Sequence, residues 1–580
     1  MPNTLDLDTR FSQQPQANIP RSIIPRKSDL KTTMQFGKLY PVYCDEILPA
    51  DSKKMSLGSL IRMATPMFPV MDSSYLDLYA FFVPNRLVWS HWEEFMGENK
   101  DSAWLSDVVY SIPTIQASAN HEGYATTDYK FAEDSIFDHF GLPTKVHVGS
   151  IPISALPLRS YNLIWNEWFR DQNYQDPIPL NTGDNDNNNA YKLLSVNKLH
   201  DEFTSVLPEP QKGADVSLLF NGGVAPVVST MYPNLTGDNG TFLANYKETW
   251  SKLNTDFDED GDLGYLRAWL PNNPGSNKKS LLSVNGTAAG SLTEYPLAGN
   301  AATDGINSTT SSGVQFLNLV ADVSQASINT INQLRNAVVV QQYLEKLALG
   351  GSRYTEQIRS MFGVVSPDAR LQRPELLGHI RLNIEMQQVV QTSFEGGDVD
   401  TTPLGNTGAY SKTTGYEFMF DKSFVEHGHL IILACARTEL SYQQGIEAMW
   451  TRRAVTDFYN PVFSNIGNQP ILNRRIFVGE DGKNDEVFGY QEAWSEYRYK
   501  PNRVSGAFRS NHSASLDSWH YAQYFDTRPI AGADFLAQTS EVVDRTLAVQ
   551  DGPELLCNFF FDEIATRPMP VYSIPGIDVL

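Results

Sequence analysis

A run of acidic residues in the middle of the chain has the spacing of a calcium-binding loop. Asp256, Asp258 and Asp260 are followed by Gly261, which reproduces the first positions of a D-x-D-x-D-G loop. Carboxylate oxygens at these positions are the ligands that Ca²⁺ prefers. The twelfth position, where a bidentate Glu is expected, holds Arg267, whose charge repels a cation. Two interpretations remain open: a weak Ca²⁺ site at Asp256, Asp258 and Asp260, or a solvated acidic turn and no cofactor at all.

A pair of histidines offers a second arrangement that can bind a metal. His427 and His429 are one residue apart, so a strand would place both imidazoles on the same face. Neither a cysteine nor a third histidine lies nearby in the sequence. Ordinary structural histidines are therefore the alternative interpretation.

Four cationic side chains lie close together near the start of the chain: Arg21, Arg26, Lys27 and Lys31. Only Asp29 opposes them within this stretch, and Pro15, Pro20 and Pro25 disfavour regular structure. We therefore predict a basic N-terminal arm over residues 1–35. It either touches nucleic acid or lies across a neighbouring subunit with its charges solvated.

The usual catalytic signatures are missing from the sequence. There is no G-x-S-x-G elbow, no G-x-x-x-x-G-K-[ST] phosphate loop, no H-E-x-x-H and no G-x-G-x-x-G after a strand. We expect a protein that is not an enzyme.

The composition is that of a globular chain with an acidic balance. The 580 residues include 45 Lys and Arg against 67 Asp and Glu, a formal net charge of −22. A protein that wraps nucleic acid by neutralising phosphates is expected to be basic. Any nucleic-acid contact must therefore be local or made through a basic partner. The charged fraction of 19% lies below the usual ~25%, which fits a surface covered by other subunits.

The sequence also bears on where the protein is made. Three widely separated cysteines favour a reducing compartment. Asp6 and Asp8 occupy the stretch where a secretion signal would carry basic and then apolar residues. The apolar run Leu430–Ala436 is much shorter than the ~20 residues of a membrane span. We expect a protein with no membrane span, made in the cytoplasm.

The elements that must position these residues are mainly strands. Apolar and polar residues alternate over 378–388, which predicts a half-buried strand, and 430–436 predicts a strand buried on both faces. Apolar residues at helical spacing predict helices over 161–169 and about 328–349. Strands and helices do not alternate regularly, so we expect an antiparallel sandwich with insertions.

Composition divides the chain into four parts. They are the arm (1–35), a first group of strands with a helical insertion (36–176), a variable surface insertion (177–312), and helices with the remaining strands (313–580). The third part is rich in Asn, Asp, Gly and Thr. Long polar stretches of this kind are typical of external loops.

Segments spread over most of the chain carry a family resemblance. They are PVYCDEILPADSKKMSLGSLIRMATPMFPVMDSSYLDLYAFFVPNRLVWSHWEEFMGE (Pro41–Glu98), LPLRSYNLIWNEWFRDQN (Leu156–Asn173), GGSRYTEQIRSMFGVVSPDARLQRPELLGH (Gly350–His379), EVFGYQEAWSEYRYKPNRVSGAFRS with LDSWHYAQYF (within Glu486–Phe525), and ADFLAQ (Ala533–Gln538). In this order they resemble the major capsid protein of the Microviridae, small tailless single-stranded DNA phages, and specifically its gokushovirus branch. Two small departures are GGSRY in place of GGTRY, and Ala50 where Gly is common in the LPGD corner.

The resemblance implies a mainly β protein, an eight-stranded antiparallel jelly roll of the viral capsid type with long helical and loop insertions. It implies a structural protein of the virion that assembles with copies of itself into a small icosahedral T=1 shell around a circular single-stranded DNA genome. The implied partners are a small basic DNA-binding virion protein, an internal scaffolding protein, the genome locally, and a host-cell receptor. The insertion at 177–312 would mediate host attachment.

A carbohydrate-binding or carbohydrate-active β-sandwich, either an adhesin or a glycosidase, is the alternative. Such a protein is also aromatic, acidic and rich in Asn and Gly. A glycosidase would need two carboxylates about 5–10 Å apart in a cleft.

Overall fold

The computed structural model describes residues 20–98, 109–115, 130–148, 151–186, 191–213, 227–230, 266–269, 281–284, 318–321, 331–349, 360, 371–392, 405–464, 466–550 and 552–572. The chain divides into two compact units. Met1–Asp215 and Val340–Leu580 form the first unit, and Val216–Val339 forms the second.

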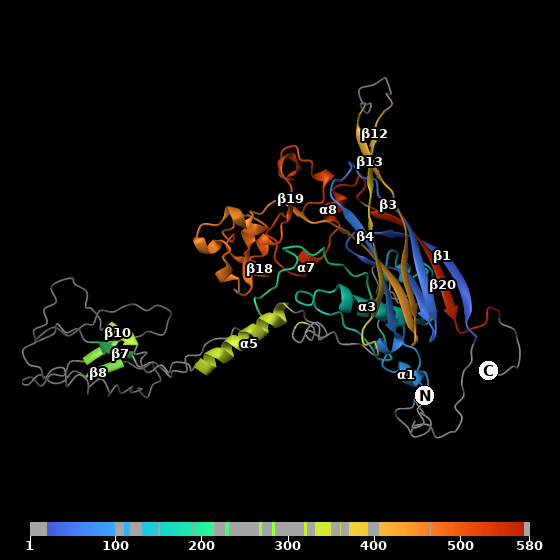
Figure 1. Cartoon of the computed structure of the whole chain (residues 1–580), viewed down its shortest axis with the longest axis horizontal. Coiled ribbons are helices and arrows are strands. Elements are labelled where there is room, and N and C mark those ends of the chain that lie inside the picture. The colour runs from blue at the N-terminus through green and yellow to red at the C-terminus, as the bar shows by residue number, and fades with distance from the viewer. Residues whose placement is uncertain are drawn as a thin grey trace, which may run out of the picture. The chain divides into compact units, whose positions relative to one another are not determined.

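Two four-stranded antiparallel sheets build the first unit (Figure 1). The first sheet has the strand order β1-β20-β3-β14, and the second has the order β11-β4-β15-β2. Their strands are β1 (Ser22–Met34), β2 (Leu39–Ile47), β3 (Ser52–Met63), β4 (Ser74–Pro84), β11 (Glu375–Asn383), β14 (Thr413–Ser423), β15 (Gly428–Thr438) and β20 (Leu555–Arg567).

The pairing of these strands follows a nested pattern along the chain. The first strand pairs with the last (β1 with β20), the second with the seventh (β2 with β15), the third with the sixth (β3 with β14) and the fourth with the fifth (β4 with β11). A long antiparallel hairpin whose strand pairs alternate between two sheets gives this order, which is the jelly roll found in viral capsid and lectin domains. The expected fold class is confirmed.

The main core lies between the two sheets and follows from the alternation of their strands. In β20 every second residue from Leu555 to Ala565 is buried, and the residues between them are partly or fully exposed. Apolar side chains from both sheets, such as Leu57 and Phe559 from the first and Leu78 and Ile432 from the second, belong to one buried cluster.

Strand β15 is buried on both faces, as its apolar run predicts. Its second face packs with α3 (Leu156–Ile164) and the turn of π-helix that follows it (Trp165–Phe169). The hydroxyl of Tyr161 donates to the carbonyl of Leu39 at 2.8 Å and accepts from the N–H of Leu194 at 3.0 Å. The helix predicted over 161–169 therefore exists, and its apolar stripe is largely core.

The remaining helices and strands of the described residues are short or lie outside the sandwich. The helices are α1 (Trp92–Phe95), α2 (Ile136–His139), α5 (Ile331–Leu349), α7 (Ala533–Leu536) and α8 (Glu541–Asp544). The two-stranded sheets pair β5 (Thr114–Ile115) with β6 (Ile153–Ser154), β12 (Met386–Val390) with β13 (Thr407–Ser411), β16 (Ser441–Tyr442) with β19 (Asn502–Arg503) and β17 (Gln469–Leu472) with β18 (Val487–Gln491). In the second unit, β7 (Val227–Thr230) pairs with β10 (Asn318–Ala321) and β8 (Leu266–Trp269) pairs with β9 (Leu281–Val284).

Two strand and helix predictions need adjustment. The alternating segment 378–388 is divided between β11 and β12, with Ile384 and Glu385 outside both strands. The helix expected over 328–349 is α5, but Leu334 and Val338 of its predicted apolar face are exposed.

The N-terminal prediction needs a larger correction. Residues 22–34 are not an arm interrupted by proline, because they form β1 and pair with β20 along its whole length. Pro25 is tolerated because β1 is the edge strand of its sheet, where a missing N–H donor breaks no ladder on the open side.

The beginning of the polar insertion also differs from the expectation. Residues up to Asp215 group with the first unit rather than with the second. Tyr191, Leu194 and Val196 are buried in the cluster beneath α3, and Phe203 and Val206 are buried in a third cluster. Composition does not reveal these core positions, because the Asn- and Asp-rich residues just before them make the whole stretch resemble a surface loop.

Candidate nucleic-acid interface

The predicted basic cluster lies at the start of the first sheet, and the alternation of β1 sends its members to different faces. In the pairing of β1 with β20, Arg26 stands opposite the buried Glu563, and Lys27 stands opposite Asp562. Successive side chains of a strand point to opposite faces. Arg26 therefore points toward the sandwich interior, whereas Lys27 and Lys31 point away from it.

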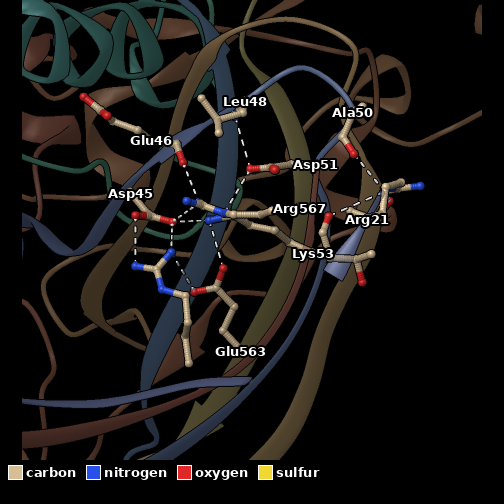
Figure 2. Close-up of polar contacts among 12 residues, drawn as sticks. Arg21, Asp45, Glu46, Leu48, Ala50, Asp51, Lys53, Glu563 and Arg567 are labelled. Atoms are coloured by element: carbon tan, nitrogen blue, oxygen red, sulfur yellow. Dashed lines mark hydrogen bonds and ion pairs between the residues drawn. The ribbon is translucent and has the colours of Figure 1, made fainter. Parts of the chain in front are cut away.

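Figure 2 shows an ionic network around Asp45, Lys53 and Glu563 that links the two sheets. Arg26 belongs to this network. Its Nη1 lies 2.6 Å from Oδ2 of Asp45, on β2, and its Nη2 lies 3.1 Å from Oδ1, a bidentate contact. Lys53 of β3 is fully buried, contacts the same carboxylate and lies 2.9 Å from Oε1 of Glu563. One aspartate of the second sheet is thus held by cations of the first.

Arg567, at the end of β20, closes the network on its other side (Figure 2). It lies 3.2 Å from Oδ2 of Asp45 and 3.3 Å from Oδ2 of Asp51, and it donates to the carbonyl of Glu46 at 3.0 Å. Burial alone would raise the pKa of Asp45, but the hydrogen bond from Arg26 and the charge of Lys53 hold that pKa below its ordinary value. The carboxylate is therefore ionised, and it binds the sheets together.

These contacts decide what the predicted basic residues can do. The guanidinium of Arg26 is engaged by Asp45, and Arg21 donates to the carbonyl of Ala50 at 2.8 Å and to Oγ of Ser52 at 2.6 Å. Both arginines thus hold the sandwich and the turn between β2 and β3. A DNA contact by either of them stays a prediction that this geometry does not favour.

The outer face of the first sheet carries the other two cations together with exposed aromatic rings. We define this face by Lys27 and Lys31 of β1, Phe560 of β20, Lys54 of β3, and Tyr416 and Phe418 of β14. The Tyr416 and Phe418 side chains are 60% and 56% exposed, which is unusual for rings on a sheet. The ammonium group of Lys54 lies 5.8 Å from the centre of the Phe418 ring.

A glycine brings two of these rings together. Gly58 of β3 lies beneath Tyr416 and Phe560: a Cβ added there would stand 3.3 Å from a ring carbon of Tyr416 and 3.4 Å from Cβ of Phe560. The Tyr416 hydroxyl also donates to Asp562 at 3.1 Å. The rings are thus held over the sheet, with their outer sides open.

The outer face has the chemistry of a surface that binds single-stranded nucleic acid. Such surfaces stack bases on aromatic rings and place cations along the backbone. Lys27 lies 3.5 Å from Asp562, but its side chain is largely exposed and can still approach a phosphate. No sequence motif marks the rings of β14 and β20. The signal was present in the period-two alternation of residues 413–418 and 555–567, where aromatic residues fall on the polar face.

A separate polar pocket of about 330 Å³ lies on the second sheet, lined by Tyr79, Phe81, Trp168, Phe169, Arg170, Asp171, Gln172, Asn173, Asn197, Lys198, His200, Leu376 and Arg437. Arg437 contacts Asp77, a fully buried carboxylate that also lies 2.6 Å from Nε of Arg381. Among these lining residues Asp171 is the single carboxylate. The pocket therefore lacks the carboxylate pair of a glycosidase.

The sequence suggested two candidate metal sites, the histidine pair and the acidic run, and the structure describes only the first. His429 is buried, and burial lowers its pKa to about 4. His427 lies just before β15 and packs edge-on against Trp92, with ring centres 5.7 Å apart. No group of three potential metal ligands occurs among the residues that the structure describes. Asp256, Asp258 and Asp260 lie outside those residues, so the Ca²⁺ site stays a prediction.

Comparison with known proteins decides the family. The family model described as "Capsid protein (F protein)" matches residues 12–577. The chain belongs to this capsid protein family. It is 39% identical over 572 residues to "Capsid protein VP1" of Bdellovibrio phage phiMH2K, which covers 98% of this chain and 97% of the relative. It is 37% identical to the proteins of the same name from Chlamydia phage 1 and Spiroplasma virus 4, which cover 98% of this chain and 98% and 97% of the relatives.

Membership of the capsid family confirms the resemblance to microvirus capsid proteins and gives this chain a structural role in the virion. Within the described ranges, no helix has the length and apolar character needed to cross a membrane.

Proposed function

We propose that this capsid protein self-assembles into a small icosahedral T=1 shell around a circular single-stranded DNA genome. The family match over nearly the whole chain and the nested strand pairing of a viral jelly roll support the shell. The proposed contact with the genome rests on the outer face of the first sheet, where exposed aromatic rings lie beside lysines.

The charge balance limits how much of the genome this chain can neutralise. With a net charge of −22 per copy, it cannot wrap DNA by counterion release alone. The outer face therefore makes local stacking contacts, and a small basic DNA-binding virion protein supplies most of the neutralisation. An internal scaffolding protein during assembly and a host-cell receptor complete the proposed partners.

Removal of the two most exposed rings tests the genome contact. Base stacking contributes about 1–3 kcal/mol per base, so Tyr416→Ser with Phe418→Ser should weaken binding to an oligo(dT) strand by about tenfold or more. Fluorescence anisotropy measures this affinity on the purified full chain. Tyr572→Ser is the matched control, because Tyr572 is also exposed but lies beyond β20.

The lysines of the same face provide a second readout. Lys27→Gln and Lys54→Gln should each reduce the slope of log Kd against log salt by about 0.7, the value for one phosphate contact on a single strand. If the double ring variant and both lysine variants bind as the parent does while shells still form, the genome contact lies elsewhere and the shell part of the proposal stands.

The second unit, Val216–Val339, is the proposed site of host attachment. Its separation from the sandwich as a compact unit supports this assignment, and external loops placed by a rigid scaffold often carry recognition. A carbohydrate-active function has less support, because Asp171 is the single carboxylate among the residues that line the polar pocket, and a glycosidase needs two.

A further inference from the structure

A second exposed surface of the first unit is formed by the segment between β16 and β17 together with the turn between β18 and β19. We call it the turn patch and define it as residues 446–464 and 466 with residues 494–499. It contains short 3-10 turns at Ala448–Trp450, Val455–Asp457, Pro461–Phe463 and Ser495–Tyr497 (orange, beside β18 in Figure 1). From Ile446 to Asn468 none of the described residues is buried.

The side chains of the turn patch are large and apolar. Trp450 is 73% exposed, Val455 87% and Val462 83%. The other exposed members are Ile446, Met449, Phe458, Tyr459, Ile466, Tyr497 and Tyr499. A globular chain normally buries residues of these types. Their concentration in one surface region therefore indicates that another protein surface covers them.

Internal contacts hold the turn patch in a defined shape. The guanidinium of Arg452 lies 4.4 Å from the centre of the Tyr497 ring and 5.5 Å from that of Phe458, and its Nη2 lies 2.9 Å from Glu496. Trp494 donates from Nε1 to the carbonyl of Phe463 at 3.0 Å. The rings are therefore positioned before any partner arrives, which lowers the entropy lost on binding.

The apolar area of the turn patch matches that of a protein interface. Its ten exposed apolar side chains present roughly 1,000 Å², taking about 150–250 Å² for each large ring when it is fully exposed. The largest apolar patch on a typical monomer is only about 300–600 Å², whereas a standard interface buries about 800 Å² on each partner.

The charged residues around the turn patch indicate which kind of partner binds it. Three charged residues in or beside the turn patch, Arg453, Lys500 and Asp457, form no ion pair within the described residues. The Asp457 carboxylate already accepts from the N–H groups of Arg453 and Ala454 at 2.8 Å, so the two cations are the charges left open to a partner, while the chain as a whole carries −22. An apolar surface with a basic rim fits an acidic partner and repels a basic one. We propose that the turn patch docks onto the acidic surface of another copy of this chain, head to tail, as closed rings of subunits require. This inference rests on the proposed shell function and names the surface that assembles it.

Charged substitutions at the two most exposed valines test the proposal. Val455→Asp with Val462→Asp should leave thermal unfolding of the subunit unchanged, because neither side chain is packed within the subunit. The concentration needed for assembly should rise at least tenfold, as sedimentation velocity and electron microscopy would show. Val425→Asp with Ile530→Asp is the matched control, since these residues are 84% and 81% exposed but lie outside the turn patch.

The rim provides an independent readout. Arg453→Glu with Lys500→Glu should also weaken assembly, and the difference from the parent chain should shrink at high salt. If the parent forms shells and both double variants form them at the same concentration, the turn patch has a different occupant. If the parent chain never forms shells even when the internal scaffolding protein is supplied, the proposed function fails instead.

Discussion

At the scale of single residues, the turn between β2 and β3 is strained at one position. Ala50 adopts a φ of +68°, in the left-handed region that costs a residue with a Cβ about 1–2 kcal/mol. This explains why the family commonly has Gly there. Ala50→Gly should therefore stabilise the subunit by about 0.5–1 kcal/mol, after the greater chain entropy of glycine is subtracted. Chemical denaturation measures the change.

A matched alanine with ordinary backbone geometry is the control for Ala50. Ala537 has a φ of −62°, so Ala537→Gly should lower the free energy of unfolding by about 0.5–1 kcal/mol. Destabilisation by both substitutions would show that the strain at Ala50 is not relieved by glycine.

Glu554 makes the stability of the subunit depend on pH. Its carboxyl is buried and accepts from the N–H of Phe36 at 2.6 Å, and burial raises its pKa from 4.5 to about 8. Between these values the folded chain binds more protons than the unfolded chain, so stability falls as pH rises from about 4.5 to about 8. Glu554→Gln keeps an acceptor for Phe36 and should flatten this part of the curve. Melting temperatures of both proteins at pH 5 and pH 8 test it, and an equal drop in both would contradict the assignment.

At the scale of elements, the ionic network joins the two sheets through a lysine that alternation sends inward. Lys53→Met should destabilise the subunit by about 3–5 kcal/mol, because it leaves the buried Glu563 and the partly buried Asp45 without that cation. Lys54→Met, one residue later, removes an exposed lysine and should change stability by less than about 0.5 kcal/mol. Denaturant unfolding of both variants is the measurement. Equal losses would mean that burial of Lys53 does not govern its contribution.

Some elements can be predicted from the sequence, because burial produces a periodic pattern of apolar residues. β15 is a continuous apolar run, and β11 alternates apolar and polar residues. Lys53 also falls in phase with Met55 and Leu57, a signal that identifies its inward direction. β1 could not be predicted in this way, because Pro25 and the prolines that precede it suggest irregular chain. Only the edge position of β1 in its sheet makes Pro25 tolerable.

At the scale of the whole molecule, the pairing of distant strands has no local signal. β1 and β20 lie at opposite ends of the described chain, and only the family resemblance indicated that they belong to one jelly roll. The turn patch was equally hidden, because exposed and buried apolar residues look alike in a sequence. The core positions at 191–206 were missed because an Asn-rich stretch precedes them.

The division into two units makes a further prediction. Replacing residues 234–312 by a short Gly-Ser linker should leave the sandwich folded, because those residues belong to the second unit. Thermal unfolding and limited proteolysis of the variant test the fold, and adsorption of particles to host cells tests attachment. An aggregated variant would show that the second unit is needed for folding, and normal adsorption would place recognition elsewhere.

The central claim is that this chain builds a closed shell whose first sheet faces the genome. Cryo-electron microscopy of particles made from the full chain tests it most directly. The account predicts an icosahedral shell in which the face with Tyr416, Phe418 and Lys54 lies against packaged DNA density. Particles whose DNA density lies against the second sheet, or preparations that contain only monomers of about 65 kDa, would contradict it.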